Sequence, residues 1–202
     1  ISHTVERGDR AATDAAFAAA AHVVTRRYVI TRVHAQYMEP RGSIGTWDPG
    51  EERFTLYADV NYPHRVRNML AAMVFKMPES KVRVLVEDVG GGFGTKGWQY
   101  LDHRLTLWAA RKLGRPVKWR CDRSEALLAD EHGRDNIGEI ALALDADGRI
   151  LGLRLHMLAS IGAYIASDRQ LLTPFGQIGT VTGVYDIPAA HVTIDAVLSN
   201  TS

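Results

Sequence analysis

The sequence is short of cysteine and of long apolar runs, and each shortage excludes a class of protein. Cys121 is the single cysteine among 202 residues, so no disulfide can form within the chain. That usage suits a reducing compartment, and we expect a cytoplasmic protein. No apolar run approaches the roughly 18 residues of a membrane-spanning helix. The first ten residues, ISHTVERGDR, are polar and lack the apolar core of a signal peptide.

The chain also lacks a strong charge of either sign. Its formal net charge is +1, which gives no electrostatic footprint for nucleic acid or an anionic membrane. Apolar residues make up 46% and charged residues 23%, the ordinary mixture of a globular protein with a buried core. The length fits one large domain or two small ones, and no linker or repeat divides it. We therefore expect a single domain over residues 1–202.

Several segments have the patterns of β-strands. Alternating or β-branched apolar residues predict strands at 23–30, 54–60, 82–87, 116–121 and 191–198. Residues 140–157 alternate on both sides of the turn sequence DADG, which predicts a hairpin. Because hairpin and crossover connections are mixed, we expect mixed sheets.

Three segments have helical patterns. Residues 11–22 are rich in alanine, and residues 64–76 place apolar side chains on one face with Pro63 in the first turn. Residues 98–114 end at Gly114 and carry an aromatic and aliphatic stripe on one face, formed by Trp98, Leu101, Leu105 and Trp108. Together with the strands, these helices predict an α+β fold with mixed β-sheets and layered helices.

The segment DVGGGFGTKG, residues 88–97, has an unusually bare backbone. It follows a predicted strand and precedes a predicted helix, which is also the layout of nucleotide-binding loops. Both motifs fail: Thr95 stands where either pattern starting at Gly90 needs a glycine, and Gly97 replaces the hydroxyl residue after the lysine of a phosphate loop. A phosphate- or nucleotide-binding module using Gly90 to Lys96 stays open as an alternative. A tight turn that merely needs positive φ is a further interpretation.

Other stretches accompany the glycine segment in a fixed order along the chain. They are QYMEPRGSIGTWDPG, the later NYPH, LGRPVKWRCDRSEALLADEHGRD, and GVYDIPAAHVTIDAVLSNTS. From about residue 20 onward, this order resembles the large subunit of the molybdenum hydroxylases, the family of xanthine dehydrogenase, aldehyde oxidase and carbon monoxide dehydrogenase. The resemblance implies a fragment of the first molybdopterin-binding domain.

The resemblance implies a cofactor and partners as well. The full subunit would bind molybdenum–molybdopterin, in the cytosine dinucleotide form, beside Gly91, Gly92, Phe93 and Gly94. Glycine backbone would approach the metal centre there, and the phenylalanine ring would exclude water. Iron–sulfur clusters and FAD would lie on companion subunits or domains, and the expected partners are an iron–sulfur small subunit and an FAD medium subunit. The reaction would hydroxylate an aldehyde or N-heterocycle with water as the oxygen source, or oxidise carbon monoxide.

Departures from the family pattern narrow the substrate. The purine hydroxylases have a glutamate where this chain has Gly97, and an arginine where it has Gly176. Without those groups we expect a small-molecule substrate other than a purine. The family's metal-facing glutamine corresponds to Val33 or Thr31, with Gln36 out of register.

The two ends of the chain suggest a piece of a longer protein. It starts at Ile1 rather than Met and stops after LSNTS, just short of the family's arginine-glycine loop. The catalytic glutamate would lie further on. We therefore assign no catalytic residue and no metal ligand within residues 1–202, and expect the isolated piece to be inactive.

The remaining candidate residues have structural interpretations. The eight histidines show no metal-ligand spacing. The charged stretch ADEHGRD, residues 129–135, is expected to be a solvated loop. Cys121 is expected in the core. Lys96 could neutralise a phosphate or pterin oxygen, or pair with a nearby acid.

Overall fold

The computed structural model describes residues 1–164 and 178–201, so Gly176 lies outside the described residues. The chain divides into two compact units. The first unit comprises residues 1–33 and 133–202, and the second comprises residues 34–132. Val33 and Gly133 form an antiparallel bridge where the chain leaves and re-enters the first unit, with Val33 N donating to Gly133 O at 3.0 Å.

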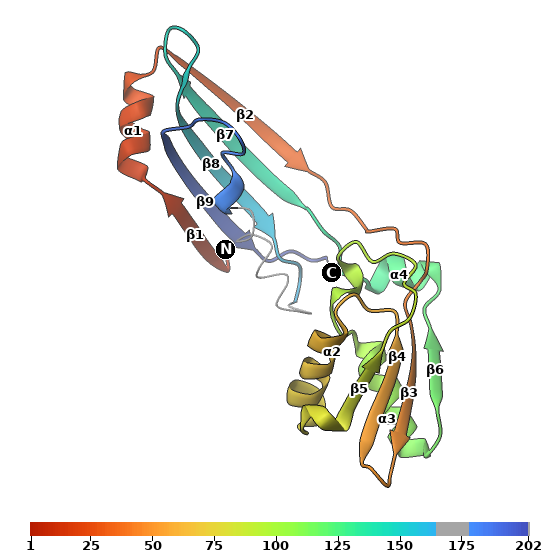
Figure 1. The fold of residues 1–202 in the computed structure, drawn as a ribbon. Coiled ribbons are helices and arrows are strands. Elements are labelled where there is room, and N and C mark those ends of the chain that lie inside the picture. Colours follow the sequence, from red (N-terminus) through yellow and green to blue (C-terminus); the bar gives the residue numbers. More distant parts are fainter. Residues whose placement is uncertain (165–177, 202) are drawn as a thin grey trace. The chain divides into compact units, whose positions relative to one another are not determined.

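The first unit is built on a five-stranded mixed sheet. Its strands, in the spatial order β1-β9-β8-β7-β2, are β1 (His3–Gly8), β9 (Ala189–Val197), β8 (Ile150–Ser160), β7 (Asn136–Leu144) and β2 (His22–Ile30). Only the β8/β9 pair is parallel within this sheet. Helix α1 (Arg10–Ala19) lies alongside it (Figure 1). The mixed pairing follows from one hairpin, β7–β8, and longer connections elsewhere.

The two faces of this sheet are covered differently. One face carries an apolar cluster that includes Leu155, Val192 and Ile194, against which Ile178 and Ile187 pack. On the other face α1 packs closely: a Cβ on Gly152 would lie 3.0 Å from the Ala16 methyl group. Helix α1 starts where the Asp9 side chain accepts a hydrogen bond from Ala12 N.

The second unit is built on a four-stranded sheet flanked by helices (Figure 1). Its strands, in the order β5-β4-β3-β6, are β5 (Val82–Leu85), β4 (Arg53–Ala58), β3 (Gly42–Asp48) and β6 (Val117–Arg120). The helices are α2 (Pro63–Met69), which continues as a π-helix (Leu70–Phe75), then α3 (Leu101–Leu113) and α4 (Arg123–Ala129). Short 3-10 helices occupy Glu79–Lys81 and Thr95–Gly97, and a further one, Ile178–Thr180, belongs to the first unit.

Close packing of α3 on β3 fixes the core of the second unit. Phe54 and Leu56 of β4 and Leu107 of α3 are fully buried in one cluster. At Gly45 the helix backbone comes so near that a Cβ would lie 2.7 Å from the carbonyl of Thr106. Gly45 therefore sets how closely the helix can approach the sheet.

The α+β prediction with mixed sheets is confirmed, and the strongly patterned elements form where expected. The expected helix at 11–22 is shorter, because β2 already starts at His22. Strands β1 and β3 and helix α4 were not predicted. Among the described residues no helix has the length and apolar character to cross a bilayer.

The expected stripe on residues 98–114 needs correction. Trp98 precedes α3 and is buried, whereas Leu101, Leu105 and Trp108 lie on the exposed face of the helix. The buried face is formed by His103, Thr106, Leu107 and Ala110. The apolar pattern therefore marks the side of the helix that points away from the sheet.

Gly45→Ala should destabilise the second unit, because the added methyl group meets backbone that cannot move aside. We expect a loss of about 1–3 kcal/mol in free energy of unfolding. Gly42→Ala in the same strand is the matched control, since its Cβ would meet Trp119 O at an ordinary 3.6 Å. All four tryptophans lie within residues 34–132, so urea unfolding followed by tryptophan fluorescence reports on this unit alone. Equal stability of the two variants would contradict the prediction.

Candidate functional site

The glycine segment forms a loop in the second unit between β5 and the 3-10 helix Thr95–Gly97. Gly91 and Gly94 have φ angles of +94° and +97°, which favour glycine. Thr95 N donates to Gly92 O at 2.8 Å and closes the turn. Helix α3 starts only at Leu101, so the direct strand–turn–helix layout of a nucleotide loop is absent here.

Two other positions in the loop must be glycine because neighbouring side chains occupy the space where a Cβ would lie. A Cβ on Gly90 would lie 2.4 Å from Cβ of Glu39, and one on Gly92 would lie 2.1 Å from Oδ1 of Asn61. Neither position can hold a larger residue without displacing these groups. The bare backbone is thus explained first by packing within the second unit.

Phe93 is the exception to this close packing. Its side chain is 76% exposed, and its φ of +46° is a strained value for a bulky residue. The edge of the ring lies against Gly91, where a Cβ would be 2.9 Å from Cε2 of Phe93. The loop therefore holds a large aromatic ring outward on a strained backbone.

Glu39 clamps this loop at both of its ends. Its Oε2 accepts from Gly90 N at 2.7 Å and from Lys96 Nζ at 3.0 Å. The Glu39 backbone N–H also donates to Gly90 O at 3.2 Å. Burial alone would raise the pKa of Glu39, but the Gly90 hydrogen bond and the Lys96 ammonium outweigh it and lower that pKa.

Lys96 is buried between two carboxylates. Its side chain is 1% exposed and forms ion pairs with Asp59 and Glu39, while Nζ lies 4.8 Å from the centre of the Tyr37 ring. Burial raises the pKa of Asp59 although Lys96 bonds to it. Of the two roles considered for Lys96, pairing with nearby acids is the one that the structure shows. The Lys96 ammonium is therefore not free to bind a phosphate.

Arg41 is a second buried cation with two carboxylates. Its Nη1 lies 2.5 Å from Asp102 Oδ1 and its Nε lies 2.7 Å from Asp130 Oδ1. The guanidinium stacks over the Tyr100 ring at 3.8 Å. Burial alone would lower the pKa of Arg41, but the two carboxylates outweigh it and raise that pKa. Glu39 and Arg41 thus project from one short segment into two separate ionic clusters.

The prediction of a solvated loop at 129–135 is wrong for Asp130. It is fully buried, and Glu131 is only 8% exposed. Besides Arg41, the Asp130 carboxylate accepts from the Tyr37 hydroxyl and lies 3.0 Å from His34 Nε2. A run of charges in sequence therefore supplies the buried anion of the second unit.

The ionic clusters shift the pKa values of nearby groups. Burial, reinforced by Asp130, raises the pKa of Tyr37, and burial raises that of Tyr100. His103 is 1% exposed, and burial lowers its pKa to about 4, so the ring is neutral at ordinary pH. Burial also raises the pKa of Cys121 to about 12, and this thiol lies in the core as expected.

The structure places Gly91 to Gly94 in one loop of the second unit. Val33 lies in the bridge to Gly133, in the first unit, and Gln36 has a φ of +49°. The side chains that hold the loop, above all Glu39 and Asn61, were not predicted, although both occur in the quoted stretches QYMEPR and NYPH. Across residues 1–164 and 178–201, no three His, Cys, Asp or Glu side chains are grouped to hold a metal ion.

Comparison with known proteins gives one consistent answer. Residues 1–202 match the family model of the molybdopterin cofactor-binding domain. The carbon monoxide dehydrogenase large chain of Hydrogenophaga pseudoflava is 39% identical, over 96% of this chain and 24% of the relative. The 6-hydroxypseudooxynicotine dehydrogenase complex subunit gamma of Paenarthrobacter nicotinovorans is 37% identical, over 93% of this chain and 23% of the relative.

Solved structures agree with these sequence matches. A carbon monoxide dehydrogenase from Oligotropha carboxidovorans matches with a TM-score of 0.91 at 35% identity, over 98% of this chain and 25% of that one. Quinoline 2-oxidoreductase from Pseudomonas putida 86 matches with a TM-score of 0.90 at 34% identity, over 98% and 25%. The chain therefore spans about a quarter of the length of the proteins it matches.

Glu39→Ala should loosen the glycine loop, because Gly90 N loses its acceptor and Lys96 loses one of its anions. We expect the second unit to lose about 1–3 kcal/mol in free energy of unfolding. Glu39→Gln keeps an acceptor and should lose less. Urea unfolding and hydrogen exchange of residues 88–97 measure both effects. Glu87→Ala, at an exposed carboxylate just before the loop, is the control. If the loop of the Glu39→Ala variant exchanged no faster than that of this control, the clamp would be contradicted.

His103 should make the second unit less stable in acid. The unfolded chain takes up a proton near pH 6.5, whereas the folded unit resists protonation down to about pH 4. Stability is therefore lost as the pH falls through this window, by about 3 kcal/mol for a shift of this size. His103→Asn, which keeps an acceptor for Tyr100 N, should flatten the pH dependence of the urea midpoint. His22→Asn, at an exposed position, should leave it unchanged.

Proposed function

Because the chain belongs to the molybdopterin cofactor-binding domain family, we propose that it forms part of the molybdenum–pterin-binding large subunit of an oxidoreductase. The whole enzyme would hydroxylate an aldehyde or a non-purine N-heterocycle with water as the oxygen source, or oxidise carbon monoxide. The relatives that match at 34% identity or more support this range by their printed names, since they include a carbon monoxide dehydrogenase, a nicotine 6-hydroxylase and a quinoline 2-oxidoreductase.

The observation that carries the proposal is the outward presentation of Phe93. The loop of Gly91, Gly92, Phe93 and Gly94 is held from behind by Glu39, Asn61 and Lys96, and its open side shows an exposed aromatic ring. Such a surface fits a cofactor that covers it: the glycine backbone allows close approach and the ring keeps water away. The molybdenum centre would supply the redox chemistry when bound. This chain's own residues would position it and exclude water.

The finer assignments follow from the same resemblance. We propose the cytosine dinucleotide form of the cofactor, an iron–sulfur small subunit and an FAD-containing medium subunit as partners, and a cytoplasmic location. We also propose that both compact units belong to one domain of the longer subunit, because a single family model spans residues 1–202.

Gly97 supports a substrate other than a purine. A Cβ at this position would lie 3.5 Å from the Tyr62 ring, an ordinary contact, so a side chain could be accommodated there. The chain nevertheless has none at this position. Residue 97 therefore offers no side-chain hydrogen-bonding group next to the loop.

Lys96 argues against the alternative of a phosphate- or nucleotide-binding module. Its ammonium is 1% exposed and already paired with Asp59 and Glu39. Releasing it to a phosphate would leave the largely buried Asp59 carboxylate without its cation, which is costly. Calorimetric titration of the chain with ATP or NAD should accordingly show no saturable binding.

The proposal is tested on the full subunit assembled with its partners. Metal and pterin analysis should find stoichiometric molybdenum, whereas residues 1–202 alone should carry none and show no turnover. Phe93→Gly relieves the strained φ and removes the ring, so folding should be retained while kcat falls about tenfold or more. Phe93→Leu, which keeps an apolar side chain, should lose less. Molybdenum-free assembled enzyme, or metal and turnover in residues 1–202 alone, would refute the proposal.

A further inference from the structure

Strand β2 is the least protected element of the first unit. All nine of its residues are exposed, including Val23 at 53%, Tyr28 at 55% and Val29 at 59%. Alternation along the strand places Val23 and Val29 on one face of the sheet and Val24 and Tyr28 on the other. Both faces of β2 therefore expose apolar side chains.

The outer edge of β2 is open as well. In the described sheet β2 is the last strand, paired along its whole length with β7 from His22↔Leu144 to Ile30↔Asn136. It contains no proline, and the register with β7 runs without a bulge, so the charges of Arg26 and Arg27 are what restricts which strand can be added at this edge. A long, regular edge strand with exposed apolar side chains is the surface that an extended segment recognises.

We propose that a β-strand from the same subunit, outside residues 1–202, pairs along the free edge of β2 and extends the five-stranded sheet. The inference rests on the proposed place of this chain in a longer subunit, but not on the cofactor site. The matched relatives are about four times as long as this chain, so a tethered segment is available at high effective concentration. Because β2 exposes apolar side chains on both faces, the added strand and the residues next to it would have to cover both faces.

Two arginines argue against a second copy of the chain as the occupant. Arg26 is the middle residue of β2, so antiparallel pairing of β2 with itself in full register places Arg26 opposite Arg26. A shift by one residue places Arg26 opposite Arg27. Like charges directly opposite each other destabilise a strand pair. Self-pairing is therefore disfavoured.

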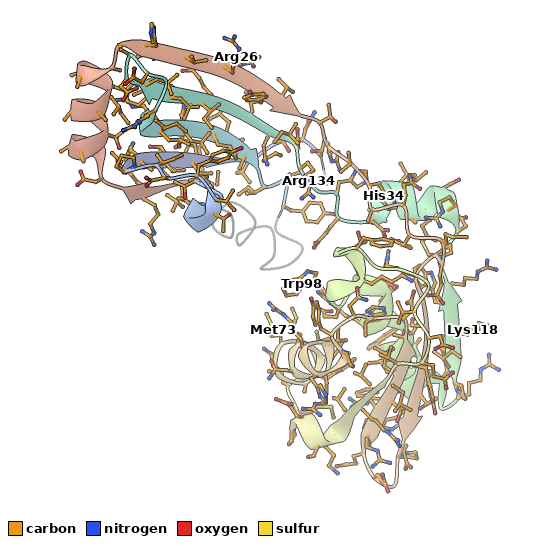
Figure 2. The ribbon with its side chains drawn as sticks, turned by 45° about the horizontal axis from the view of Figure 1, so that its top comes forward. Arg26, His34, Met73, Trp98, Lys118 and Arg134 are labelled. Carbon is orange, nitrogen blue, oxygen red and sulfur yellow. The ribbon has the colours of Figure 1, made fainter. Side chains whose placement is uncertain are left out.

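The same arginines indicate what the incoming strand carries. Arg27 lies opposite Glu139 of β7, whereas Arg26 lies opposite Ile140 and donates to the carbonyl of its neighbour Thr25 at 2.9 Å. Figure 2 shows the Arg26 side chain standing out beyond the ribbon of β2. An acidic side chain opposite Arg26 would complete this edge, so the occupant is an extended segment with an acidic residue at that point.

Photo-crosslinking of the assembled enzyme tests the occupant. Tyr28→p-benzoylphenylalanine keeps an aromatic ring at an exposed position, and mass spectrometry identifies what it captures. The expected product is a link within the same polypeptide to residues outside 1–202, absent from enzyme irradiated in urea. A link to a companion subunit or a second copy, or no link, would overturn the proposal. The molybdenum content of the same preparation is measured as well. If molybdenum is present but the expected link is not, the strand pairing is wrong while the proposed function stands.

Charge variants test the acidic residue. Arg26→Glu should lower the yield of the intramolecular link several-fold, because two acidic groups then face each other. Arg26→Lys keeps the positive charge and should retain the yield. Equal yields from both variants, with the link still formed, would show that no acidic residue faces position 26.

Discussion

The second unit depends on matching two buried cations with acidic side chains. Lys96 and Arg41 are almost completely removed from water, and each contacts two acidic side chains. A buried charge without a partner costs several kcal/mol, so each buried cation needs its acidic partners in place in the folded unit. Because Glu39 and Arg41 flank a single proline, the two clusters share one short segment. The position of the glycine loop is therefore tied to the position of α3 and of the segment that contains Asp130.

The helices and strands that could be predicted from the sequence are those with a strong local pattern. Elements with a strong local pattern, such as the hairpin of β7 and β8 or the helix after Pro63, were predicted because their periodicity is visible in a few residues. Strand β3 was missed because Gly42 and Gly45 interrupt its pattern, although α3 packs directly on Gly45. The stripe of Leu101, Leu105 and Trp108 was visible but points away from the sheet. Periodicity identifies a helix; it does not say what covers the apolar face.

The sequence identified the glycine loop as the candidate site, but not the side chains that hold the loop in place. A run of four glycines around one phenylalanine is conspicuous in any sequence. The reason for two of those glycines is the close approach of Glu39 and Asn61, which are both distant from the loop in sequence. Asp130 was likewise placed in a solvated loop because nothing nearby in sequence shows its contact with Arg41. Pairings over such separations leave no local signal.

The contacts of Glu39 with the glycine loop fix the loop's backbone. In the part of the chain that the structure describes, Phe93 keeps a strained φ and is 76% exposed. Strain of this kind, of the order of 1–3 kcal/mol, persists only where surrounding contacts determine the backbone. The clamp of Glu39 on Gly90 and Lys96 supplies those contacts. The loop is thus ordered before any ligand arrives, and a ligand that binds there would not have to pay the entropy of ordering it. This preorganisation distinguishes the Phe93 loop from β2, whose open edge acquires its hydrogen bonds only when another strand is added.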